Sequence, residues 1–202
     1  PADFAASVAE HARHLRVPLR ITVVDATGRL LYTDIAAAGA RPGMALGDLR
    51  QFAVHRESEG DRLYVGRPER FRIGGAWAVQ FTRPIRAADG RLLGVIAASV
   101  PPSYFLRFYD SIDLGPDATV SLLRLDGVVI ARSSRRNDSP HMGQGITNSP
   151  QVRSPELNGA FRKVSQIDGV ERFYAWRKLP EYGVVVTVGQ AVLDAETRFA
   201  QQ

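Results

Sequence analysis

Cysteine is absent from this chain of 202 residues, and long apolar runs are absent too. Without cysteine there is neither a disulfide framework nor thiol chemistry, and the redox compartment stays open. No apolar run reaches the roughly 18 residues that a membrane-spanning helix needs, and no signal peptide is recognisable. Because the chain starts abruptly at Pro1, we expect an excised segment whose flanking regions can include membrane helices.

The motifs of common enzymes are missing as well. The sequence contains no Gly-x-Ser-x-Gly elbow, no His-Glu-x-x-His zinc motif and no phosphate loop ending in Gly-Lys-Ser/Thr. His11 and His14 are three residues apart on an expected helix, but no cysteine or clear third ligand accompanies them. We therefore expect no enzymatic activity, no metal site and no cofactor.

Lysine is scarce in a chain that is nonetheless basic. The net charge is +5 and the isoelectric point about 10.0, yet Lys163 and Lys178 are the only lysines, so arginine supplies nearly all of the positive charge. The arginines are scattered singly, unlike the basic runs of nucleic-acid-binding tails. This distribution predicts a solvated basic surface with a few arginines turned toward a small anion, and no nucleic-acid partner.

One segment of the chain occurs twice. Residues 21–34 (ITVVDATGRLLYTD) match residues 120–133 (VSLLRLDGVVIARS) without a gap, and residues 71–85 match residues 165–179 in the same order. Each match alone is weak, because unrelated hairpins share alternation and a turn glycine. Together they indicate one antiparallel sheet module used twice.

The pattern along the chain predicts an α+β layout. Phe4, Val8, Ala12 and Leu15 have the spacing of one helix face, and Pro18 ends that run. In the first module we expect strands at 21–24, 29–33, 64–68, 70–73, 77–83 and 92–100, with helices at 50–56 and 103–112. In the second we expect a hairpin around Asp126-Gly127, strands at 159–167, 170–178 and 183–190, and a short exit helix within 191–200.

In order and spacing, these segments resemble the double Cache sensor domains. They are tandem PAS-like modules found outside the membrane in bacterial histidine kinases, diguanylate cyclases and chemoreceptors. The resemblance rests on VVDATGRLLYTD, LRQF, LYVGRP, WAVQFTRPIRAADGRLLGVIAAS, SYFLRFYDSIDLGPDATVSLLRLDGVVIARS and QIDGVERFYAWRKLPEYGVVVTVG. It implies an N-terminal helix (1–18), a membrane-distal module (19–113), a membrane-proximal module (114–190) and an exit helix (191–202).

The same resemblance implies a location and partners. Such domains lie on the periplasmic side of the inner membrane, bind a small molecule in the distal module and relay to a cytoplasmic kinase, cyclase or other output domain. A homodimer through the N-terminal helix is compatible with this arrangement. The alternative is a structural or partner-binding module of such a receptor that has no small ligand.

For the ligand site we expect seven residues of the first module: Arg50, Phe52, His55, Tyr64, Arg67, Trp77 and Arg83. Arg50 and Phe52 stand where amino-acid-binding members of the family have Arg-x-Trp-Tyr, so Arg50 could hold a ligand carboxylate. A surface helix arginine is the simpler alternative for Arg50, and an ordinary histidine for His55. Arg83 and Arg177 occupy matching places in the repeat, which favours an ion pair at the sheet edge for both.

Two carboxylates of that subgroup are missing here. Its Tyr-x-Asp is Tyr64-Val65-Gly66 in this chain, and Ser99 replaces the Asp at the end of a later strand. A buried ligand ammonium would lack its counter-charge, which is costly. An organic acid or another uncharged or anionic molecule is therefore favoured over a standard amino acid. We expect no comparable polar cluster in the second module.

Four aspartates stand beside turn glycines. Asp89, Asp126 and Asp168 directly precede glycine, and Asp25 lies three residues before Gly28. These positions predict turn residues rather than a set of metal or acid–base carboxylates.

Overall fold

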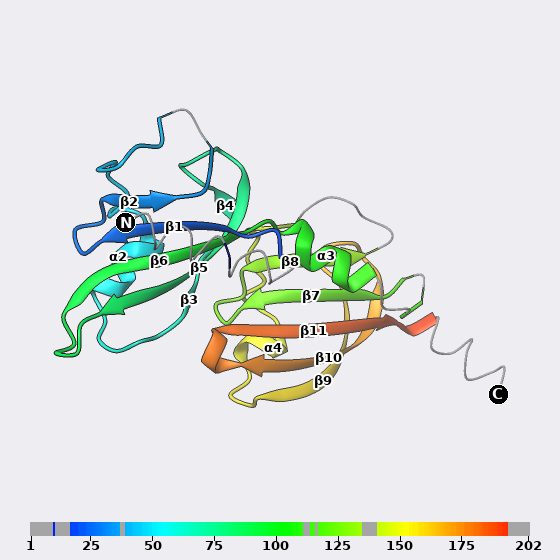
Figure 1. The fold of residues 1–202 in the computed structure, drawn as a ribbon. Helices are drawn as coiled ribbons and strands as arrows, with labels where there is room; N and C mark the ends of the chain where they lie inside the picture. Colours follow the sequence, from blue (N-terminus) through cyan, green and yellow to red (C-terminus); the bar gives the residue numbers. More distant parts are fainter. Residues whose placement is uncertain are drawn as a thin grey trace. The chain divides into compact units, whose positions relative to one another are not determined.

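The computed structural model (Figure 1) describes residue 10 and residues 17–36, 39–110, 114–115, 117–134 and 141–193. The chain divides into two compact units, Pro1–Tyr104 and Phe105–Gln202. Most of the predicted N-terminal helix, including His11 and His14, and most of the predicted exit helix lie outside the described residues. Each unit has its own antiparallel sheet, which gives the predicted α+β class.

The first unit is a sheet with one helix against it. Its strand order is β2-β1-β6-β5-β3, with β4 paired to β5. The strands are β1 (Arg20–Asp25), β2 (Leu30–Thr33), β3 (Tyr64–Val65), β4 (Glu69–Arg70), β5 (Trp77–Arg86) and β6 (Leu92–Val100), and the helix is α2 (Arg50–Arg56). Helix α2 packs against β3, β5 and β6.

The burial of α2 follows its sequence. Gln51, Phe52 and His55 are its buried residues, and positions i, i+1 and i+4 share one helix face. Phe52 joins a core that includes Val24 from β1 and Val95 from β6. The helix bounds match the prediction.

The predicted strands at 64–68 and 70–73 are too long. The structure has only the two-residue strands β3 and β4 there. Phe71 and Ile73 turn inward instead and are almost fully buried in the first core. The Gly75 N–H donates to the Phe71 carbonyl oxygen at 3.1 Å, so residues 71–75 form a turn in place of the predicted strand.

The second unit repeats the architecture. Its strand order is β8-β7-β11-β10-β9. As in the first sheet, the initial hairpin lies at one edge and the last strand of the unit pairs with it. The strands are β7 (Thr119–Arg124), β8 (Val129–Ser134), β9 (Asn158–Val164), β10 (Glu171–Leu179) and β11 (Val184–Ala191). Helices α3 (Ser103–Asp110) and α4 (Pro150–Arg153) and the 3-10 turn η1 (Pro180–Tyr182) complete the described elements.

The duplication extends to irregular details. A bulge interrupts the first hairpin between Val23 and Val24, and another interrupts its copy between Leu122 and Leu123, 99 positions on. Arg29 forms an isolated bridge with Ala45, and Val128 forms one with Gly145. Shared bulges and bridges would not arise from a turn glycine and alternation alone, so the predicted repeat is confirmed.

The turn aspartates behave as predicted, and Asp168 does more. The Asp25 carboxylate accepts hydrogen bonds from the backbone of Thr27 and Arg29. Asp168 is buried and receives two hydrogen bonds from Arg172, at 2.8 and 2.9 Å, and one from Arg132 at 2.8 Å. Burial alone would raise its pKa, but the bonds from Arg172 and Ser165 and the arginine charges outweigh burial and hold the pKa well below its usual range.

Candidate functional site

The face of the first sheet beneath α2 is lined by polar side chains. The Thr82 hydroxyl donates to the Gln51 carbonyl oxygen at 2.9 Å, which places Thr82 on the α2 face. Alternation along β5 puts Gln80 on the same face. Tyr64 pairs with Thr82 across β3, and Ser99 pairs with Gln80 across β6, so both share this face. We call Tyr64, Gln80, Thr82 and Ser99 the α2-face cluster.

His55 is locked to this cluster by its hydrogen bond. Because the Thr82 hydroxyl proton goes to Gln51, the Thr82 oxygen must accept from His55 Nε2, 2.8 Å away. The neutral imidazole therefore has its proton on Nε2. Burial, followed by the positive charge of Arg86, lowers the pKa of His55. His55 is thus a neutral donor at neutral pH, rather than an exposed base.

Arg50 lies at the start of α2, close to the cluster. Its Nη1 donates to Glu57 Oε2 at 2.6 Å, and both side chains are more than half exposed. The Glu57 hydrogen bond is the main cause of its raised pKa, and Tyr64 adds to the same shift, which places Tyr64 near the guanidinium. His55 and Tyr64 meet edge to face, 6.5 Å between ring centres. The structure therefore brings Arg50, His55 and Tyr64 together.

Gln80 is the most unusual member of the cluster. Its side chain is 0% exposed, its Oε1 accepts from Ser99 at 2.8 Å, and its Nε2 has no hydrogen-bond partner. Gly66 lies directly beside it: a Cβ on Gly66 would stand 3.3 Å from the Gln80 carbonyl oxygen and 3.4 Å from its Cβ. The two positions that lack the expected carboxylates, Gly66 and Ser99, therefore both adjoin Gln80.

The other predicted site residues lie elsewhere. Phe52 is part of the hydrophobic core, while Arg67 and Trp77 are exposed. Arg83 follows Thr82 in β5 and so points to the opposite face of the sheet, where it forms a 3.0 Å ion pair with Asp61. Strand alternation keeps Arg83 away from the α2-face cluster.

Both the sequence and the fold of this chain are similar to those of known proteins. Residues 102–189 match the family model dCache_1_like, described as a histidine kinase sensor domain. The extracellular domain of rpHK1S-Z16, assigned as a histidine kinase, superposes with a TM-score of 0.74 at 28% identity, covering 90% of this chain and 74% of that one. The fold is that of a double Cache sensor domain. No curated protein matches the sequence significantly.

Other solved structures extend the similarity in fold. The extracellular domain of mmHK1S-Z3, also assigned as a histidine kinase, has a TM-score of 0.71 at 13% identity and covers 100% of this chain and 83% of that one. The ligand-binding domain of the Pseudomonas fluorescens chemoreceptor CtaA, in complex with L-isoleucine, has a TM-score of 0.65 at 14% identity and covers 93% and 74%. These neighbours are thus two extracellular domains of proteins assigned as histidine kinases and the ligand-binding domain of a chemoreceptor.

Sequence patterns missed one structural arginine in the first unit. Arg86 donates to the carbonyl oxygens of His55, Ser58, Gly60 and Gly90 at 2.7 to 3.1 Å. It thereby fixes the loop that follows α2. A lone arginine at a strand end gave no signal for this role, because its acceptors are backbone atoms that any residue supplies.

The expectation of no polar cluster in the second Cache module is wrong. Ser121, Gln151, Lys163 and Thr187 line a cavity there. Gln151 could have been found from the repeat, since Gln51 is its counterpart one hundred positions earlier in α2. Ser121 and Thr187 are isolated polar residues in apolar strands, which give only a weak signal.

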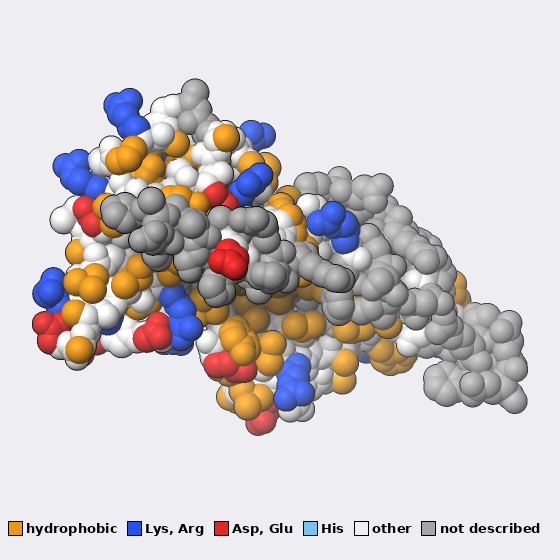
Figure 2. Space-filling view, viewed as in Figure 1, with side chains coloured by type: hydrophobic (Ala, Val, Ile, Leu, Met, Phe, Trp, Pro, Cys, Tyr) orange, Lys and Arg blue, Asp and Glu red, His pale blue; other side chains and the backbone are white. Residues whose placement is uncertain are grey.

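Two further properties concern the described residues alone. Among them, no three His, Cys, Asp or Glu side chains gather closely enough to hold a metal ion. None of their helices is long and apolar enough to cross a membrane. Figure 2 shows Lys and Arg side chains scattered over the visible face, with Asp and Glu among them, rather than gathered into one basic patch.

Proposed function

We propose that this chain is the extracytoplasmic ligand-sensing domain of a bacterial signal-transduction receptor, most closely a histidine kinase. The match to a histidine kinase sensor model and the 28% identity to the extracellular domain of rpHK1S-Z16 support this choice of receptor class. In this proposal the domain lies on the periplasmic side of the inner membrane. It has no catalytic role of its own and relays ligand binding to a cytoplasmic output domain.

The proposed ligand site is the α2-face cluster of the first module, and the unpartnered Nε2 of Gln80 is the observation that supports it most. A buried amide without a partner costs about 1–3 kcal/mol. Fold stability alone would favour an apolar residue at that position. A bound molecule that accepts a hydrogen bond from Nε2 would recover that loss.

The ligand class follows from the charges around Gln80. CtaA is in complex with L-isoleucine and PctB of Pseudomonas aeruginosa with L-Arg, so these neighbours accommodate an ammonium group. Here Gly66 and Ser99 occupy the two places expected to supply carboxylates, and neither can balance an ammonium charge. We therefore propose an organic acid or an uncharged polar molecule, rather than a standard amino acid.

Arg50 is the proposed anchor for a ligand carboxylate. In the described structure it is paired with Glu57 at the surface, and a ligand would take the place of Glu57. Exchange of one carboxylate for another lets α2 and its loop respond to binding at small electrostatic cost. A ligand shifts the receptor only by its preference for one state, and a micromolar ligand has about 8 kcal/mol from which that preference can come.

A thermal-shift screen of organic acids, amino acids, amines and purines tests the function. A ligand at 100 times its Kd should stabilise the domain by about 2.7 kcal/mol. Arg50→Ala should weaken the binding of a carboxylate hit at least tenfold, because a charge-assisted bond is worth about 1.5–3 kcal/mol. Arg91→Ala removes the same charge from an exposed turn and should bind normally.

Two results would count against the proposal. If no compound in the screen stabilises the domain, the alternative of a structural or dimerisation module, with contacts through the N-terminal helix, would be favoured. Equal binding by Arg50→Ala and Arg91→Ala would remove Arg50 from the site while leaving the sensor function in place.

A further inference from the structure

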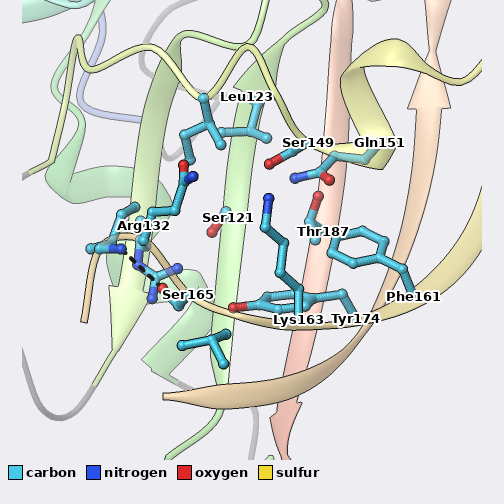
Figure 3. A pocket seen from close by; sticks show the side chains of 14 residues that line it. Ser121, Leu123, Arg132, Ser149, Gln151, Phe161, Lys163, Ser165, Tyr174 and Thr187 are labelled. Carbon is cyan, nitrogen blue, oxygen red and sulfur yellow. Dashed lines mark hydrogen bonds between the residues drawn. The ribbon is translucent and has the colours of Figure 1, made fainter. Parts of the chain in front are cut away.

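The second unit contains a cavity of its own. It is lined by residues of β7, β8, β9, β10 and β11 and of α4 (Figure 3). Its volume is about 50 Å³, whereas one water needs about 10–15 Å³. The cavity therefore has room for about three to five waters, or for one small molecule whose covalently bonded atoms each take up less space.

Two buried groups in this cavity lack hydrogen-bond partners. Thr187 and Gln151 are 3% and 5% exposed, and both Thr187 Oγ1 and Gln151 Oε1 are without a partner. Both residues line the cavity. Ser121, which pairs with Thr187 across β7 and β11, adds a second buried hydroxyl on the same face. A polar occupant that both donates and accepts hydrogen bonds would satisfy these groups.

The charge of the cavity is positive. Among the described residues that line it, none has a carboxylate, whereas Arg132 and Lys163 are cationic. Arg132 is already paired with Asp168 at 2.8 Å, a carboxylate that it shares with Arg172. Lys163 Nζ has one long bond, 3.4 Å, to the Asn148 carbonyl oxygen. Figure 3 shows its ammonium directed toward Ser149, Gln151 and Thr187, so Lys163 is available to an anion.

The remaining walls are mostly apolar. Phe161 of β9 stacks on Tyr174 of β10, with 5.0 Å between ring centres and 21° between planes. Leu123 and Ile146 belong to the adjoining second core and also line the cavity. A short carbon skeleton can pack against these side chains while its polar end faces Lys163.

We propose that this cavity is a second ligand site, which binds a short-chain hydroxycarboxylate. Lys163 pairs with the carboxylate, and the Thr187 hydroxyl donates to it. The ligand hydroxyl donates to Gln151 Oε1. This site is separate from the one proposed in the first unit, and each can exist without the other.

The test uses the whole chain with glycolate and lactate as probes, followed by calorimetry and by backbone amide chemical shifts in NMR. Both probes should bind, with shift changes in residues 119–191. Propionate, which lacks the hydroxyl, should bind more weakly, and the uncharged lactamide should not bind measurably. Lys163→Met should weaken lactate binding about tenfold or more.

Thr187→Val separates a ligand role from a structural one. Removal of a buried hydroxyl without a partner should raise the melting temperature of the free protein by about 2–4 °C, while lactate binding weakens. A hydroxyl that stabilised the fold would instead lower the melting temperature when removed.

Arg162→Met is the matched control. Arg162 precedes Lys163 in β9, points to the other face and pairs with Glu171, so this variant should bind lactate normally. Unchanged affinity in both Lys163→Met and Thr187→Val would overturn the inference, as would no binding of either probe at millimolar concentration. Shift changes confined to residues 20–100 would also overturn it, and would leave the site in the first unit standing.

Discussion

At the scale of single residues, chemistry depends on which side of a strand a residue occupies. Arg83 and Thr82 are neighbours in sequence, yet Thr82 contacts α2 and Arg83 pairs with Asp61 at the opposite face. The sequence identifies candidate polar residues well, because their types are explicit. It does not show which of two adjacent strand residues faces the helix. For β5, the hydrogen bond from Thr82 to Gln51 settles the question.

His55 should make stability depend on pH near neutrality. Its pKa in the folded state is lowered by burial and by Arg86, so the unfolded chain takes up the proton first. The stabilisation is complete above the ordinary value of about 6.5 and is lost as pH falls through the lower folded value. The free energy of unfolding, measured with urea between pH 7.5 and 5, should therefore decrease on acidification.

His55→Gln supplies the comparison for this pH effect. Glutamine can keep an N–H donor for Thr82 but does not titrate, so the pH dependence of the variant should be shallower. The other histidines are common to both proteins and cancel in the difference. Identical slopes in the two proteins would exclude His55 as the source.

At the scale of elements, the same hairpin, present twice in the sequence, begins both sheets. Its strands and helix α2 were accessible from sequence, because alternation, turn glycines and the repeat agree with one another. The strand order of the two sheets was not predicted and comes from the structure. The cavity of the second unit was not accessible in the same way. Its polar residues come one at a time from five strands and a short helix, and only the folded register brings them together.

Gly28 should be essential to the first hairpin. It has a φ of +82°, and a Cβ there would stand 2.1 Å from the Cα of Gly47, which no side chain can tolerate. Gly90 has a similar φ of +86° with no atom within 4 Å. Gly90→Ala should cost about 1–2 kcal/mol for its left-handed backbone, and Gly28→Ala roughly 1–3 kcal/mol more for the added clash.

Chemical denaturation of the two glycine variants measures that difference. Both have the same change of residue and the same backbone strain, so only the close approach to Gly47 separates them. Equal destabilisation would mean that the loop containing Gly47 moves away freely.

At the scale of the whole molecule, the described residues of each unit include a hydrophobic core cluster. One cluster includes Val24, Phe52 and Val95, all from the first unit, and another includes Leu123, Trp176 and Val185, all from the second. Separate cores predict that damage in one unit is felt mainly there. The duplicated scaffold can then support different ligands, because each unit has its own polar residues on a common frame.

Asp168→Asn should destabilise the second unit selectively. The substitution leaves Arg132 and Arg172 buried without their shared counter-charge, a loss of about 3–5 kcal/mol. Hydrogen exchange should accelerate across residues 119–191 and stay unchanged across residues 20–100. Asp89→Asn, at an exposed turn beside Arg91, should cost less than about 1 kcal/mol. Faster exchange in both units of Asp168→Asn would mean that they unfold as one.

The contact between Gly66 and Gln80 also limits which residues can replace Gly66 during evolution. Because a side chain at residue 66 would press on the Gln80 backbone and Cβ, a mutation that restores a carboxylate there must be accompanied by a change or shift at residue 80. Among related receptors, the two positions should therefore covary. If the first unit binds an organic acid as proposed, a lineage that gained a carboxylate at residue 66 would also have to absorb a displacement of a few tenths of an ångström at Gln80.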